Sequence, residues 1–250
     1  MVQLKSTAEI EKMRRAGAIV AQVLMEIEDL VKPGCSTADL DLFAQTRTKE
    51  LGAKPAFKGY HGFPGTLCVS VNEEVVHGIP SKKRLLKDGD IVGIDFGVVL
   101  DGWFGDSART FPVGKVSVEA ANLLKITEKS LFLGIEQANS GQNLFDIGHA
   151  IQIYVESFGY SVVREFVGHG IGKALHEDPQ VPNFGVRGRG MLLKPGMVLA
   201  IEPMINAGKP EVRVLSDGWT AVTADKRLSA HFEHTIAITE SGTEILTKVL

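Results

Sequence analysis

Residues 91–111, IVGIDFGVVLDGWFGDSARTF, form a pattern of two β-strands joined by a tight turn at Asp101-Gly102. Asp-Gly between two apolar runs is a strong hairpin signal, because both residues of the favoured two-residue turn take a positive φ. With this turn, the numbers of cross-strand partners add up to 203, so Asp95 faces Ala108 and Asp106 faces Gly97. Side chains alternate between the two faces of a strand, and Asp95 and Asp106 are therefore predicted to share a face.

These two aspartates are expected to be diagonal neighbours, roughly 7–8 Å apart at the backbone. Two carboxylates at this spacing repel each other, and the flanking Val, Ile and Phe residues leave them poorly solvated. A cation between them removes both problems. An edge hairpin with two solvated aspartates is the alternative, but the apolar flanks argue against it. The pattern favours a metal site.

Two further acids lie in apolar segments. Glu202 stands near the end of GMVLAIEP (196–203), and Glu233 lies within SAHFEHTIAIT (229–239). A buried carboxylate needs a partner, yet Lys and Arg are sparse around both acids, and Arg227 is the nearest in sequence to Glu233. One of the acids could find a salt bridge in the fold. Two of them, beside an aspartate pair, favour cations.

His169 lies in a glycine-rich segment, FVGHGIGKALHEDP (166–179). A lone histidine is usually structural, but the glycines on both sides of His169 allow the backbone to approach a metal closely. The four carboxylates balance the charge of two divalent cations, and one neutral imidazole completes the ligand set. Such oxygen-rich ligation suits Mn, Fe(II), Co or Zn and does not choose among them. Two cations that share carboxylates are a recurring hydrolytic arrangement.

Helical spacing predicts four helices around these segments. The first begins at a Ser6–Glu9 capping box and is ended by Pro33-Gly34; the second begins at Ser36 or Thr37 and stops near Gly52; the others cover residues 118–138 and 144–158. Three pairs share a separation of 107 residues: Gly34 and Gly141, Asp39 and Asp146, and Leu40 and Ile147. Chance is the alternative explanation. We predict one α/β domain over residues 1–250, with helix–helix–sheet halves of about 1–112 and 113–250 and helices backing a curved antiparallel sheet. A site between such halves would take residues from both.

Composition narrows the class of protein. The 250 residues are 44% hydrophobic and 23% charged, which is ordinary for a globular protein, and the formal net charge is −3. No half is strongly basic, so nucleic acid is not expected as the main partner. The start of the chain lacks the apolar region of a signal peptide, and no apolar run is long enough to cross a bilayer. Two cysteines are too few for a disulfide framework. We expect a cytoplasmic protein without a membrane partner.

The five candidate ligands, in this order and in their local contexts, resemble those of type I methionine aminopeptidases. The matching segments are IEKMRRAGAIV, GYHGFP, SVNEEVVHGIP, residues 91–111, GHGIGKALHEDPQVPNFG, GMVLAIEPMI and SAHFEHTIAIT. They extend from about Thr7 to Ile245, and five ligands in matching contexts are a highly specific signal. The 31 residues between Glu202 and Glu233 leave no room for the helical insert of type II enzymes, and the chain starts at the catalytic unit. The resemblance is to the short bacterial form.

This resemblance implies the pita-bread fold and the removal of the initiator methionine from nascent proteins when the next residue is small. It implies two divalent cations bound by Asp95, Asp106, His169, Glu202 and Glu233. Asp106 and Glu233 would bridge the cations, while His169 and Glu202 would serve one of them. A metal-bound water would attack the methionyl carbonyl, with Glu202 moving the proton.

The same resemblance assigns roles to two further histidines and a side-chain pocket. His176 would contact the developing oxyanion, and His77 the scissile amide. The methionine pocket would be apolar, with Tyr60, Phe63, Cys68 and Trp219 as its walls and Phe57 and Leu175 as less certain members. Without the resemblance, core packing is the better explanation of these apolar residues. The substrate would be the N-terminus of a nascent chain, and a monomer is expected. Contact with the ribosome fits such a substrate, but no segment indicates it.

Three alternatives stay open at this point. A prolidase or aminopeptidase P shares the fold but usually carries a large extra N-terminal domain. A catalytically dead pita-bread protein would have lost ligands, whereas all five are present here. A dinuclear phosphatase would be expected to add cationic phosphate clamps, and Lys and Arg are scarce in these motifs.

Overall fold

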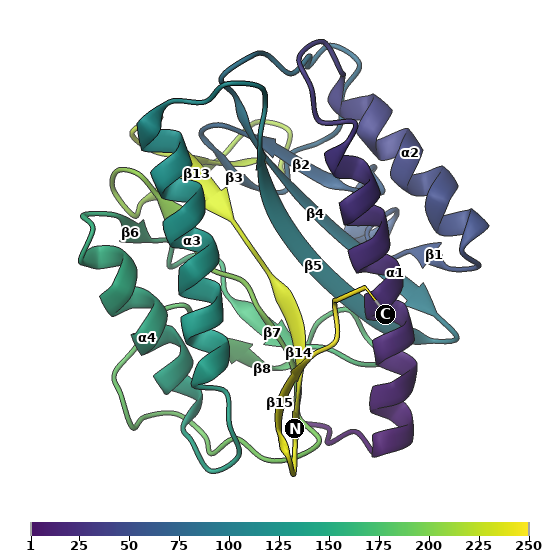
Figure 1. Ribbon diagram of the computed structural model, residues 1–250, viewed down its shortest axis with the longest axis vertical. Coiled ribbons are helices and arrows are strands. Elements are labelled where there is room, and N and C mark those ends of the chain that lie inside the picture. Colours follow the sequence, from purple (N-terminus) through teal and green to yellow (C-terminus); the bar gives the residue numbers. More distant parts are fainter. Residues whose placement is uncertain (1, 250) are drawn as a thin grey trace.

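The computed structural model describes residues 2–249, and four α-helices form its outer layer. They are α1 (Thr7–Glu28), α2 (Thr37–Glu50), α3 (Val118–Glu136) and α4 (Leu144–Glu156), and a 3₁₀ turn, η1, covers Tyr60–Gly62. The pairs α1–α2 and α3–α4 lie side by side in front of the strands (Figure 1). The four predicted helices are therefore confirmed, two in each half of the chain.

Capping by short polar side chains starts three of these helices. Ser6 and Glu9 form the predicted capping box of α1, and Ser36 with Asp39 does the same for α2. The predicted end of the first helix was wrong, because α1 stops at Glu28 rather than at Pro33-Gly34. The N–H groups of Leu30 and Val31 bond to carbonyls only three residues back, so tightening turns end the helix before the proline is reached.

The strands pair antiparallel in four sheets. One sheet holds β1 (Lys54–Pro55), β2 (Cys68–Val71), β4 (Ile91–Leu100) and β5 (Trp103–Pro112); a second holds β3 (Glu74–Val76), β11 (Val212–Val214) and β12 (Ala221–Thr223). A third holds β6 (Ser161–Val162), β10 (Met204–Asn206) and β13 (Ser229–His231). The fourth holds β7 (Gly168–Gly170), β8 (Glu177–Val181), β9 (Val198–Ile201), β14 (His234–Thr239) and β15 (Gly242–Ile245).

The hairpin predicted at residues 91–111 is confirmed in its register. Asp95 pairs with Ala108, and Gly97 pairs with Asp106. Asp101 and Gly102 have φ values of 50° and 80°, as a two-residue turn of this kind requires. Asp95 and Asp106 therefore lie on one face of the hairpin, as diagonal neighbours.

A second ribbon of the same kind holds the two glutamates. Strands β9 and β10 keep one register against β14 and β13, so that Ile201 pairs with His234 and Met204 pairs with His231. The same register, continued through the short gap between these pairs, sets Glu202 opposite Glu233. Pro203 has no N–H to give to the ladder. The predicted curved antiparallel sheet is therefore interrupted here, and the hydrogen-bonded ladders divide into separate sheets.

The separation of 107 residues recurs in the contacts. Gly34 N–H donates to Leu86 O and Gly141 N–H to Leu193 O, at 2.8 and 2.9 Å. Isolated bridges join Ser36 to Leu85 and Asn143 to Leu192. Each of these pairs in the first half has its counterpart 107 residues later in the second half. The same separation relates Asp95 to Glu202. These equivalences support the proposal of one domain built from two related halves.

The core has one main cluster for each half. Leu40, Ile94 and Phe96 are among the buried residues between α1, α2 and the first sheet, while Leu123, Ile147 and Ile236 are among those beneath α3 and α4. No helix within residues 2–249 is both long and apolar enough to span a membrane.

Candidate metal centre and substrate cavity

A cavity of about 280 Å³ is lined by every residue that the sequence analysis proposed for the site. Its lining combines the carboxylates with histidines and apolar side chains: Phe57, Tyr60, His61, Phe63, Cys68, His77, Asp95, Asp106, His169, Leu175, His176, Glu202, Trp219 and Glu233. The lining residues come from both halves of the chain. The first half supplies two of the carboxylates, and the second half supplies the other two.

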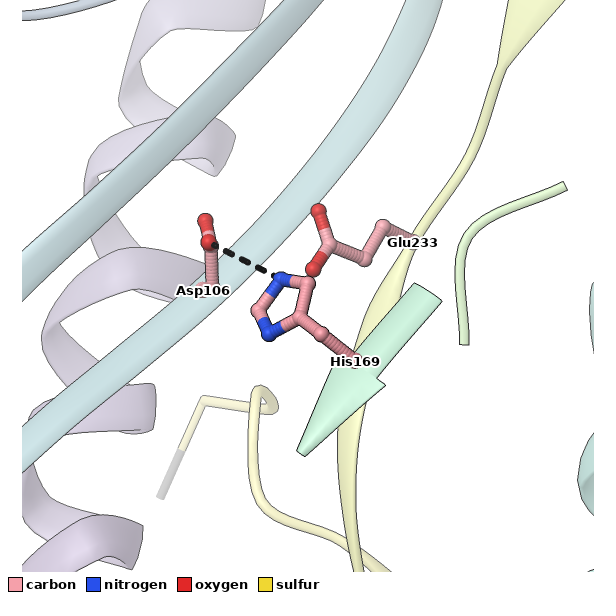
Figure 2. Close-up of side chains that lie close together, drawn as sticks. All are labelled: Asp106, His169 and Glu233. Carbon is pink, nitrogen blue, oxygen red and sulfur yellow. Dashed lines mark ion pairs between the residues drawn. The ribbon is translucent and has the colours of Figure 1, made fainter. Parts of the chain in front are cut away.

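Asp106, His169 and Glu233 point toward one another from three different segments (Figure 2). Their potential ligand atoms all lie within 4.8 Å of one another. His169 Nε2 is 4.0 Å from Asp106 Oδ2 and 3.5 Å from Glu202 Oε1. These spacings are those of side chains arranged around a common centre rather than of direct hydrogen bonds.

Hydrogen bonds between the two halves fix where these side chains start. Glu233 N–H donates to Ala108 O at 2.8 Å, and Ser107 Oγ donates to Glu233 O at 2.5 Å. Thr235 Oγ1 accepts from Asp106 N–H and donates to Asp106 O. The chain around Glu233 is thus tied to β5, and Asp106 and Glu233 come close together as a consequence.

Burial dominates the electrostatics of the four carboxyl groups. It raises the pKa of Asp95 to about 7 and that of Glu202 to about 8. The pKa values of Asp106 and Glu233 are raised well above their usual range, first by burial and then by neighbouring carboxylate charge. The protein alone therefore holds these groups in an environment that disfavours their charged form, and a cation would reverse this preference.

The unsatisfied atoms of the cluster fit a metal. Asp95 Oδ1, Asp106 Oδ1 and Glu233 Oε1 are buried without a hydrogen-bond partner. Within residues 2–249, the ion pairs of this cluster involve only imidazoles, while Arg227, the nearest cation to Glu233 in sequence, pairs with Glu119 at the surface. Buried oxygen atoms without donors are what divalent cations require, so the residues present fit the group.

The ring of His169 has one nitrogen, Nε2, available as a metal ligand. Its Nδ1 donates to Gly170 O at 2.8 Å, so that in the neutral ring the Nε2 lone pair faces the carboxylates. Burial, with His176 beside it, lowers the pKa of His169 to about 3, which keeps the ring neutral. The glycines on either side of His169 leave no room for a side chain. A Cβ at Gly168 would lie 2.3 Å from Ala200 O, and a Cβ at Gly170 would lie 2.1 Å from Asp178 O.

Two other histidines border the cavity. His176 Nδ1 is 2.8 Å from the hydroxyl of Tyr60, and its ring lies 4.4 Å from that of His169. Burial lowers the pKa of His77 to about 4, and its ring packs edge-on against Trp219. Burial also lowers the pKa of His176. Both imidazoles therefore line the same cavity as the carboxylates and are uncharged near neutral pH.

Apolar side chains form part of the cavity lining. Phe63 and Cys68 are 3% and 5% exposed, and the ring of Phe63 meets that of Trp219 edge-on at 5.2 Å. Burial raises the pKa of the Cys68 thiol well above its usual range, so the thiol stays neutral. The carboxylate cluster thus adjoins a small, uncharged wall.

Sequence reasoning missed two histidines of this site. His61 lines the cavity and has a φ of 47°; it was present in the matching segment GYHGFP but was given no role. His231 is buried, with Nε2 3.6 Å from Glu202 Oε2 and no hydrogen-bond partner. Its place two residues before Glu233 puts both on one face of the ribbon, which was the signal that could have found it.

Comparison with known proteins agrees with this geometry. Residues 11–240 match the model of metallopeptidase family M24. Methionine aminopeptidase 1 of Bacillus subtilis is 56% identical over 249 residues, covering 100% of both chains. The crystal structure of methionine aminopeptidase from Thermotoga maritima superposes with a TM-score of 0.98 at 49% identity, over 99% of this chain and 100% of that one. The prolidase of Pyrococcus horikoshii superposes with a TM-score of 0.79 at 26% identity, and this chain covers only 64% of it.

Proposed function

The chain belongs to metallopeptidase family M24 and is a methionine aminopeptidase; from this premise we propose that two divalent cations, bound by Asp95, Asp106, His169, Glu202 and Glu233, serve the removal of initiator methionine when the second residue is small. We further propose that Asp106 and Glu233 bridge the cations. The supporting observation is that these two carboxylates and His169 point toward one another (Figure 2), with ligand atoms within 4.8 Å, and that each carboxylate has a buried oxygen without a hydrogen-bond partner. Cobalt, manganese, iron and zinc all suit this donor set.

Bound divalent cations supply polarisation of the scissile carbonyl and acidification of a water molecule. Glu202 is proposed to take up a proton and release it to the leaving amine, because its carboxyl group lines the cavity with His169 Nε2 at 3.5 Å and His231 Nε2 at 3.6 Å. Asn183 donates to the main-chain oxygen of Glu202 at 3.0 Å, which holds the residue in place at the edge of the cavity.

His176 is proposed to stabilise negative charge on the carbonyl oxygen. Burial lowers its pKa, so the ring is neutral. Burial also raises the pKa of Tyr60, which keeps the phenol protonated and able to donate to His176 Nδ1. In that tautomer Nε2 carries the hydrogen and is the donor toward the developing oxyanion. His77, which lines the same cavity and packs against Trp219, is proposed to contact the scissile amide.

Selection of methionine is proposed to rest on the apolar wall of Tyr60, Phe63, Cys68 and Trp219. An unbranched thioether fills such a pocket without a polar group to satisfy. A charged side chain would lose its hydration there, and none of these four wall residues carries an opposite charge that could compensate for the loss.

The proposal is tested by turnover of Met-Ala-Ser after metal removal, with single metals added back. We expect no turnover without metal, and recovery that saturates at two metal equivalents per chain. Saturation at one equivalent would contradict the dinuclear site. An X-Pro dipeptide and an aryl phosphate serve as controls for a prolidase and for a phosphatase, and neither should be cleaved.

Two further proposals concern the setting of the reaction. Nascent chains are the natural source of an N-terminal methionine, so we propose that the enzyme works in the cytoplasm, close to the ribosome. The site is complete within one chain, which supports a monomer. Sedimentation of the purified protein and co-sedimentation with translating ribosomes check these two points.

A further inference from the structure

A buried ion pair connects the start of the chain to the segment that carries His176. Lys5 Nζ lies 2.6 Å from Glu177 Oε2, and the two side chains are only 4% and 10% exposed. Lys5 is among the few buried charged residues of the protein. Removing one partner of such a pair leaves the other charge buried without compensation, so the local structure must rearrange.

Glu177 uses its second oxygen to close the loop before His176. Oε1 accepts from the N–H groups of Lys173 and Ala174, at 2.8 and 3.2 Å. The space for this carboxylate exists because residue 172 is a glycine, where a Cβ would lie 2.6 Å from both Glu177 Oε1 and Lys5 Cε. His176 is the residue directly before Glu177, so the carboxylate fixes one end of the backbone on which the imidazole stands.

Lys5 is itself held from outside this loop. Its N–H donates to Gly196 O at 2.7 Å, and its Nζ also donates to Gln3 O at 3.0 Å. The ammonium group is thus fixed relative to the second half of the chain before it meets Glu177. At the other end, the hydroxyl of Tyr60 restrains the His176 ring.

We propose that Lys5 and Glu177 are positioning residues, which hold the loop at residues 172–176 so that His176 Nε2 reaches the carbonyl oxygen of the substrate. The inference rests on the role of His176 given under the proposed function. It assigns a part in the reaction to residues 2–6, the described segment before α1, none of which lines the cavity.

Kinetics of Lys5→Met test this role, because methionine keeps most of the side-chain length and removes the charge. A misplaced catalytic group acts on the transition state, so we expect kcat for Met-Ala-Ser to fall roughly ten- to hundredfold. KM should stay within about threefold and the metal content should not change. In a His176→Ala background the substitution of Lys5 should cause no further loss, since its effect passes through the imidazole.

Arg14→Met is the matched control. Arg14 also joins the N-terminal part of the chain to a distant strand, by a 2.7 Å contact with Glu244, but neither residue of this pair lines the cavity or contacts the loop at residues 172–176 through a hydrogen bond or ion pair. Its kcat should equal that of the wild type. Glu177→Gln, which keeps the size of the side chain, is the second variant and should behave as Lys5→Met does.

A readout without turnover separates this inference from the proposed function. In the metal-free protein, the ring resonance of His176, identified by its loss in His176→Ala, should shift in Lys5→Met and stay in place in Arg14→Met. An inactive wild type would refute the proposed function, while the resonance would still decide the positioning role. Unchanged kcat in the folded Lys5→Met and Glu177→Gln proteins, equal losses in Arg14→Met, or full additivity with His176→Ala would overturn the inference.

Discussion

Replacing Glu202 by glutamine should stabilise the metal-free protein at pH 8 while it destroys activity. The carboxyl group of Glu202 has its pKa raised by burial from the usual 4.5 to about 8. A folded-state pKa above the unfolded value means that the folded protein binds more protons. Stability therefore falls as pH rises from about 4.5 to about 8, and glutamine, which does not ionise, escapes this loss.

The size of the effect follows from the shift. One pKa unit corresponds to about 1.4 kcal/mol, so a shift of this size amounts to about 4–5 kcal/mol when the group is fully ionised. The titration of Glu202 is coupled to that of Asp95, Asp106 and Glu233, and the structure around the charge can relax. Both effects make the loss of stability smaller than this figure, and we expect Glu202→Gln to gain about 2 kcal/mol at pH 8. For a chain of this length such a gain raises Tm by roughly 4–8 °C.

Thermal unfolding in the presence of a chelator measures this effect. Wild type and Glu202→Gln should have similar Tm values at pH 5, where the folded carboxyl is protonated, and should separate at pH 8. Saturating Mn²⁺ should reverse the order, because ligands that bind only the folded state stabilise it in proportion to their affinity. Glu240→Gln, at an exposed position, should change Tm little under any of these conditions. A metal-free Glu202→Gln protein that is no more stable than the wild type at pH 8 would refute the reasoning.

Other substitutions test single roles. Asp106→Asn should abolish turnover and lower the bound metal below two equivalents, measured by elemental analysis; normal turnover with two metals would exclude bridging by Asp106. His176→Ala should lower kcat and kcat/KM together, roughly a hundredfold, with normal metal content, and weaker metal binding would require a different role. In X-Gly-Met-Met peptides with X as methionine, norleucine, leucine or lysine, norleucine should be cleaved at a measurable rate, because an apolar pocket discriminates a methylene by only about 1–3 kcal/mol. Leucine should be cleaved much more slowly because its branch collides with the pocket wall, and lysine not at all because its ammonium group would be desolvated. Similar kcat/KM values for all four would indicate a general aminopeptidase.

The register of the first ribbon was predictable from local chemistry alone. Asp101-Gly102 defines the turn, and the period of two then decides which side chains share a face. This is why the placement of Asp95 beside Asp106 followed from the sequence. The predicted helix starts were equally local, since Ser6 and Ser36 are N-cap residues that form capping boxes with acids three residues later.

Features that depend on distant pairing were not predictable in the same way. Lys5 and Glu177 are 172 residues apart, and neither lies in a motif that points to the other. The two-residue spacing between His231 and Glu233 indicates a shared face, but only the fold reveals that His231 Nε2 lies 3.6 Å from Glu202 Oε2. The break in the sheet at Glu202 and Pro203 likewise appears only when the partner strand is known, because each strand by itself has ordinary apolar character.

The arrangement of the carboxylates explains why the site belongs to the whole chain. Each half presents two acids on one antiparallel ribbon, and the ribbons are joined by bonds between Thr110 and His231, Ser107 and Glu233, and Asp106 and Thr235. These bonds involve main-chain atoms and hydroxyl groups, so they do not depend on the charge of the carboxylates. The repulsion between the acids can therefore build up without separating the ribbons. Either half alone would keep its own pair of acids but would lose the opposing pair that completes the centre.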